Sequence, residues 1–111
     1  MKVCITSKGK DLQSPVDPRF GRCSNFIFIE TETMTFETID NNAAGASGGA
    51  GIQSAQLISD KGASVVVTGN FGPNASTALN AAGVKMIIGA QGVTVAEALK
   101  NYQDGKYNEV T

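Results

Sequence analysis

The chain has 111 residues, of which 41% are hydrophobic, two cysteines, no histidine and a formal net charge of −1. Its length suits one domain over residues 1–111, and its near-zero charge argues against recruitment of nucleic acid or a membrane surface. The cysteine and histidine counts exclude a four-cysteine zinc site and a self-contained four-cysteine iron–sulfur site. No apolar run approaches the roughly 18 residues of a membrane span. Because the N-terminus lacks signal-peptide organisation, we expect a cytoplasmic protein with reduced thiols.

Three strands are predicted in the N-terminal half. Residues 2–6 (KVCIT) and 25–30 (NFIFIE) are apolar, whereas 35–40 (TFETID) is more polar and suits a sheet edge. A long loop, 7–24, joins the first two strands, and a short turn near Glu32 joins the second to the third. These segments predict an antiparallel meander.

The pattern changes after the glycine-rich segment 41–51, which we expect to be flexible. Gly51, Ala55, Ile58 and Gly62 would share one face of a helix that begins near Ala50. The β-branched run 63–69 is typical of a strand covered on both faces.

Two further helices and one strand follow. Pro73 suits the first position of a helix that Gly83 would end. Residues 84–88 predict a buried strand. Thr94 and Glu97 form a capping-box pattern before a last helix that Gly105 would end.

The predicted order is therefore β-β-β-α-β-α-β-α. The alternating half requires parallel strands with right-handed crossovers. We predict an α/β fold, with a three-layer α/β/α arrangement and a mixed five-stranded sheet.

This topology places loops 7–24, 41–51, 69–74 and 89–94 and all three helix N-termini at one rim of the sheet. Open α/β proteins bind ligands at such rims. Helix N-termini attract anions, and glycines allow close backbone approach. The rim chemistry thus favours a small anion. The candidate glycines are Gly48, Gly49 and Gly51, and the first loop carries Lys8, Lys10, Arg19 and Arg22.

Each candidate residue also has a structural interpretation. The glycine-rich run could simply open a helix, and Phe20 could close the core. Arg19 and Arg22 could pair with surface acids. Cys4 is expected in the core, whereas Cys23 lies beside Arg22, whose charge would lower the thiol pKa and favour a thiolate.

Three segments resemble the dinitrogenase iron–molybdenum cofactor biosynthesis family. They are the first strand with its loop, DPRFGRCSNFIFIE, and GGAGIQSAQLISDKGASVVVTGNFGPNASTALNAAGVKMI. The resemblance covers nearly the whole chain, and it implies a ribonuclease H-like α/β/α fold. The matching positions are Asp17, Arg19, Phe20, Gly21 and Arg22 in the first motif and Asn70, Gly72 and Pro73 in the second.

The resemblance implies a non-catalytic carrier of an anionic metal–sulfur cluster: the iron–molybdenum cofactor, its precursor or a related molybdenum cluster with iron or copper. Such a cluster brings its own sulfide ligands. Backbone N–H groups and arginines could hold it, with Cys23 as the single protein metal ligand. A protein donor or acceptor of the cluster is a further expected partner. Some family carriers use a histidine, which this chain lacks.

A regulatory module, a nuclease and a cysteine-dependent enzyme are alternative functions for such a chain. A small-anion or nucleotide-binding regulatory module is the alternative that the helix N-termini and glycines allow. A two-metal nuclease would need clustered carboxylates on the first and fourth strands, and KVCITS and VVVTGN have none. Catalysis through Cys23 would lack a histidine partner.

Overall fold

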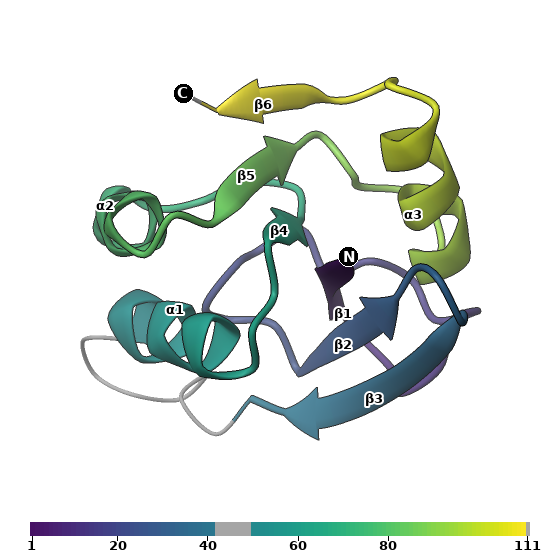
Figure 1. The fold of residues 1–111 in the computed structure, drawn as a ribbon, viewed down its shortest axis with the longest axis horizontal. Coiled ribbons are helices and arrows are strands. Elements are labelled where there is room, and N and C mark those ends of the chain that lie inside the picture. Colours follow the sequence, from purple (N-terminus) through teal and green to yellow (C-terminus); the bar gives the residue numbers. More distant parts are fainter. Residues whose placement is uncertain (42–49, 111) are drawn as a thin grey trace.

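The computed structural model describes residues 1–41 and 50–110. These residues form three helices and six strands in an α/β fold (Figure 1). In chain order the elements are β1 (Lys2–Ser7), β2 (Asn25–Glu30), β3 (Thr35–Asp40), α1 (Ala50–Asp60), β4 (Val65–Val67), α2 (Pro73–Ala81), β5 (Lys85–Ile88), α3 (Val95–Gln103) and β6 (Asn108–Val110).

All six strands belong to one mixed sheet with the order β3-β2-β1-β4-β5-β6. The β1–β2 and β2–β3 pairs are antiparallel, as the predicted meander requires, and β1, β4 and β5 are mutually parallel. The predicted count of five strands is wrong, because β6 adds an antiparallel edge strand beside β5. β6 has only three residues, and two of them are polar, so its pairing depends on the exposed edge of β5 rather than on its own pattern.

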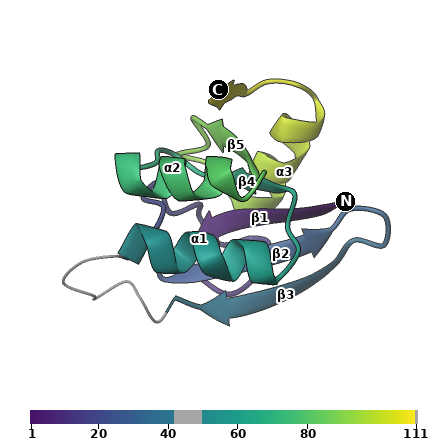
Figure 2. The ribbon, with the colours of Figure 1, turned by 60° about the vertical axis from the view of Figure 1, so that its left-hand side comes forward.

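The helices cover both faces of the sheet, with α1 and α2 on one face and α3 on the other (Figures 1 and 2). Alternation along β1 separates two buried clusters. Cys4 faces α1 and α2 together with Phe26, whereas Val3 and Ile5 belong to the cluster that packs against α3. Cys4 is completely buried, which confirms its expected place in the core.

The predicted helix ends are confirmed. Pro73 occupies the first turn of α2, and the Thr94–Glu97 capping box is formed at the start of α3. Gly83 and Gly105 follow the last helical turns with positive φ angles of 75° and 76°, a conformation that favours glycine.

The contact between α1 and α2 depends on small residues. A Cβ added at Gly51 would lie 3.0 Å from the Cβ of Ala75. We therefore expect Gly51→Val to lower the free energy of unfolding by roughly 1–3 kcal/mol through overpacking. Ala78→Leu should act in the same direction, because Ala78 packs against the same cluster. Urea denaturation would check both variants, and unchanged midpoints would contradict this assignment of the packing face.

β1, β4 and β5 are parallel, so their carboxyl ends meet at one edge of the sheet. The segment after β1, the segment after β4 and the start of α2 lie at this edge, which we call the rim.

Within residues 1–41 and 50–110, no helix is both long enough and apolar enough to cross a membrane.

Candidate functional site

The loop that contains Asp17 to Cys23 is fixed to the chain that leaves β4. The Asn70 backbone N–H donates to the Pro18 carbonyl at 2.9 Å, and the Phe20 N–H donates to the Asn70 carbonyl at 3.2 Å. Gly69 allows this approach, because an added Cβ would lie 2.7 Å from the Cα and the carbonyl oxygen of Pro18. The two sequence motifs that carry the resemblance are therefore in direct contact.

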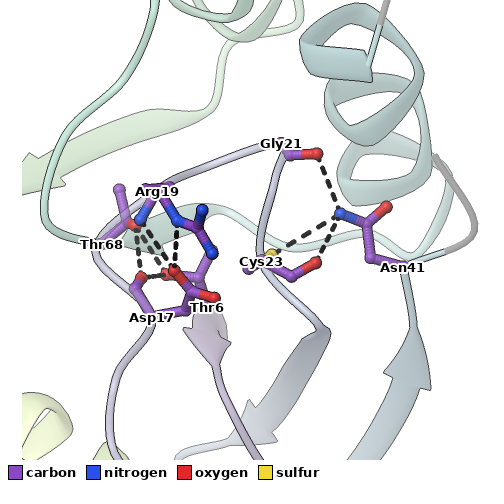
Figure 3. A network of polar contacts seen from close by, with 7 residues as sticks. All are labelled: Thr6, Asp17, Arg19, Gly21, Cys23, Asn41 and Thr68. Carbon is purple, nitrogen blue, oxygen red and sulfur yellow. Dashed lines mark hydrogen bonds and ion pairs between the residues drawn. The ribbon is translucent and has the colours of Figure 1, made fainter. Parts of the chain in front are cut away.

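A buried polar network lies beneath this contact (Figure 3). Thr6 Oγ1 lies 2.6 Å from Thr68 Oγ1 and donates to the Asp17 carbonyl at 2.6 Å. Thr68 Oγ1 also lies within hydrogen-bond distance of that carbonyl, at 3.3 Å. Both threonines are completely buried, so the network joins β1, the loop and the end of β4.

Thr68→Val should weaken this connection. Valine has a similar shape but removes one hydroxyl from a buried network, which costs roughly 1–2 kcal/mol of folding stability. We expect a lower thermal midpoint without loss of the fold. Circular dichroism melting would measure it, and a midpoint equal to that of the unchanged chain would contradict the role of the network.

The two arginines of the loop are both exposed. Asp17 is 1% exposed, and its Oδ1 accepts hydrogen bonds from the Arg19 backbone N–H at 3.1 Å and from Arg19 Nε at 3.4 Å. The Arg19 side chain is nevertheless 68% exposed. Positive charge therefore lies on the outer surface of a loop whose inner side is held by buried bonds.

Phe20 points inward and closes the core. It is 6% exposed, and its ring centroid lies 5.9 Å from that of Phe26 and 5.1 Å from that of Phe71. Gly21 follows with a φ angle of 88°, which favours glycine. These contacts agree with the structural interpretation of Phe20, and contact between a ligand and Phe20 or Gly21 stays a prediction.

Cys23 differs from expectation. Its side chain is completely buried, and burial, with a contribution from the charge of Asp17, raises the pKa of the thiol to about 12. The expectation that Arg22 lowers this pKa is wrong, because desolvation and a neighbouring carboxylate outweigh an exposed guanidinium. Asn41 Nδ2 donates to the carbonyls of Gly21 and Cys23 and lies 3.8 Å from Cys23 Sγ (Figure 3). Cys23 as a metal ligand stays a prediction.

The raised pKa predicts a stability change with pH. Above the unfolded value of about 8.5 the unfolded chain loses the Cys23 proton, whereas the folded chain retains it until about pH 12. The thiol therefore lowers folding stability by up to about 1.4 kcal/mol per pH unit in this window. Cys23→Val should fall less steeply than the unchanged chain in urea denaturation between pH 8.5 and 10.5. Parallel curves would contradict the burial of a neutral thiol.

The helix N-termini at the rim are not equivalent. The Val95 and Ala96 N–H groups of α3 donate to the carbonyls of Ser14 and Leu12, at 2.9 and 2.8 Å. The first turn of α3 is thus satisfied by the loop and by its capping box. At α2 the N-cap is Gly72, which provides no side-chain cap and has open space around it. α2 is therefore better suited than α3 to receive an anion.

The remaining candidate residues lie in different places. Asn70 is exposed and touches the loop through its backbone, while its Oδ1 accepts from the Phe71 N–H at 2.9 Å. Gly51 serves the contact between α1 and α2. Gly48 and Gly49 lie outside the described residues. Arg19, Phe20, Gly21, Arg22, Cys23, Asn70 and Gly72 thus lie on two adjacent rim segments.

Four residues of this region were missed by the sequence predictions: Thr6, Asn41, Thr68 and Gly69. Only their position in the sequence could have indicated them: Thr6 and Thr68 each lie near the end of a parallel strand, and Gly69 and Asn41 follow strands.

Two surface hollows, of about 270 and 300 Å³, involve none of the predicted site residues.

These features define a small α/β protein whose irregular segments meet where α/β proteins bind ligands. Residues 1–105 match the family described as "Dinitrogenase iron-molybdenum cofactor". The chain belongs to this family.

Three known proteins are similar to this chain. The orange protein of Desulfovibrio gigas, solved in its apo form, shares 40% identity and has a TM-score of 0.96, with 99% of this chain and 92% of that chain covered. A putative NifB protein from Thermotoga, assigned to the DUF35 family, shares 39% identity with a TM-score of 0.85 and coverage of 97% and 91%. An "uncharacterized protein" of Methanocaldococcus jannaschii is 31% identical over 94 residues, covering 82% of this chain and 79% of the relative.

Proposed function

We propose that the protein binds and carries an anionic metal–sulfur cluster as cargo, without catalysing a reaction. The cargo would be the iron–molybdenum cofactor, its precursor or a related molybdenum sulfide cluster that contains iron or copper. Membership of the cofactor family and similarity to the orange protein, which exists in an apo form, both support a cluster-binding or carrier role.

The observation that carries the proposal is the chemistry of the available donors. Within residues 1–41 and 50–110, no group of three or more His, Cys, Asp and Glu side chains is arranged to hold a metal ion. A cargo that already has sulfide ligands does not need such a group. It needs hydrogen-bond donors and positive charge, which the rim supplies through Arg19, Arg22 and the first turn of α2 at Gly72.

The other parts of the proposal are the non-catalytic role, the protein partner, the location and the fold assignment. Cys23 is buried with a raised pKa, so it is poorly suited to be a catalytic nucleophile in this conformation. A protein donor or acceptor of the cluster and a cytoplasmic location are expected for such a carrier. The meander followed by parallel crossovers supports a ribonuclease H-like assignment of the fold.

A small-anion or nucleotide-binding regulatory module is the second candidate. It is favoured by the open N-cap at Gly72, which would accept any compact anion. Nucleotide titration followed by backbone amide shifts would distinguish it, because only this candidate predicts saturable shifts at Gly72 without a sulfide cluster.

Anaerobic reconstitution tests the carrier proposal. The protein would be incubated with molybdate, sulfide and either copper or iron, and then desalted. We expect a coloured complex with a fixed ratio of metal to protein. Desalted protein without metal in both mixtures would contradict the proposal.

A further inference from the structure

Asp17 places a carboxylate in a buried position where the local turn does not require a charge. Its side chain is 1% exposed, and its Oδ1 accepts the Arg19 backbone N–H at 3.1 Å. This hydrogen bond spans two residues, and a neutral Asn could form the same turn. Because a buried carboxylate is costly unless it is paired, the choice of Asp at this position requires a further explanation.

The guanidinium of Arg19 is the charged partner of this carboxylate. Arg19 Nε lies 3.4 Å from Asp17 Oδ1, and Figure 3 shows the two side chains next to each other. Among the described residues, Nε is the only side-chain nitrogen of Arg19 that forms a hydrogen bond or an ion pair. The two Nη groups therefore remain for a ligand, at the outer end of a side chain that is 68% exposed.

The backbone of Arg19 is fixed as well. Arg19 and Asn70 form an isolated parallel β-bridge, and the Arg19 carbonyl accepts the Arg22 N–H at 3.3 Å. Since Asp17 also holds Nε, the Arg19 side chain is restrained at both of its ends. Gly72 follows Asn70 by two residues, so Arg19 and the open N-cap of α2 lie on adjacent parts of the rim.

We propose that Asp17 is a positioning residue that orients the Arg19 guanidinium toward an anion with two acceptor atoms on one edge. This inference rests on the proposed function. The two Nη groups carry parallel N–H donors, which match two terminal sulfur or oxygen atoms of a molybdenum anion. A guanidinium that is oriented in advance also loses less conformational entropy when the anion binds.

Titration with tetrathiomolybdate alone tests the assignment. Asp17→Asn keeps an acceptor for the Arg19 backbone N–H and removes the charge that holds the guanidinium. We expect its affinity for tetrathiomolybdate to fall by about 2- to 12-fold, the factor that corresponds to ordering one flexible side chain. Charge alone predicts the opposite sign, because loss of a nearby negative charge would strengthen the binding of an anion. Equal or higher affinity in Asp17→Asn would overturn the proposal.

A chain that carries Arg19→Ala separates positioning from a general effect on the loop. In that chain Asp17→Asn should not change the affinity further, because the group that Asp17 positions is absent. Circular dichroism melting would establish that each variant is folded at the temperature of the titration. The same fold-loss of affinity with and without Arg19 would show that Asp17 acts through loop structure alone.

Arg19→Lys is a second test that does not depend on the stability of Asp17→Asn. Lysine keeps the positive charge, but one ammonium group cannot bond to Asp17 and also present two parallel donors. We expect an affinity about 10-fold below that of the unchanged chain, as for loss of one charge-assisted hydrogen bond. Equal affinity would contradict a role for guanidinium orientation. Failure of the unchanged chain to bind tetrathiomolybdate would instead contradict the proposed function.

Discussion

Gly69→Ala is expected to lower the free energy of unfolding by about 2–3 kcal/mol, a large effect for one methyl group. The new Cβ would lie 2.7 Å from the Cα and carbonyl oxygen of Pro18, and backbone atoms cannot move aside as a flexible side chain can. Relief requires the loop to separate from the end of β4. That movement would break the two backbone hydrogen bonds between Pro18, Phe20 and Asn70. Urea denaturation would measure the loss.

Gly72→Ala is the matched control. It lies three residues along the same segment, has open space around its Cα, and has a φ angle of −79°, which alanine adopts freely. We expect a change within about 0.5 kcal/mol. Similar losses in the two variants would show that glycine content, rather than contact with Pro18, determines stability here.

Replacing both Arg19 and Arg22 with alanine should weaken cluster binding by about 100-fold. Each charge-assisted hydrogen bond contributes roughly 1.5–3 kcal/mol, so the loss of two exceeds 100-fold even at the lower value. The fold should survive, because both side chains are exposed and Asp17 keeps its bond from the Arg19 backbone N–H. Binding would be measured by titration with a soluble thiomolybdate anion.

A charge-matched control distinguishes the loss of a defined binding site from the loss of net positive charge. Lys100→Ala with Lys106→Ala also removes two positive charges, from exposed positions in and after the last turn of α3. This pair should bind thiomolybdate almost as well as the unchanged chain, because exposed charges more than about 10 Å away are largely screened at ordinary salt. Equal weakening by both pairs would contradict a defined site at the rim.

Much of the fold was predictable because local patterns agree with the tertiary structure. The helix starts at Pro73 and Thr94 and the ends at Gly83 and Gly105 depend on capping chemistry within a few residues, which the sequence displays. β6 was not predictable in this way. Its three residues have a weak pattern, and the pairing partner is the edge of β5 rather than anything local.

The candidate site was predicted less completely, for physical reasons. Topology alone brings the Arg19 and Gly72 segments to one rim. The pKa of Cys23 depends on burial and on Asp17, six residues away in sequence, and neither is visible in the pair Arg22–Cys23. The first N–H groups of α3 donate to carbonyls of the loop, and these hydrogen bonds are also long-range contacts. Because those N–H groups are already used, we expect the anion at the N-terminus of α2 instead.

Anaerobic purification from the native host, followed by analysis of metals and acid-labile sulfide, tests the central claim most directly. The claim is that the chain carries a cluster that brings its own sulfide ligands, because the described residues provide no metal-binding group of three or more side chains. We predict molybdenum, with iron or copper, together with labile sulfide in a fixed ratio to protein. Metal without sulfide, or neither metal nor sulfide, would contradict it.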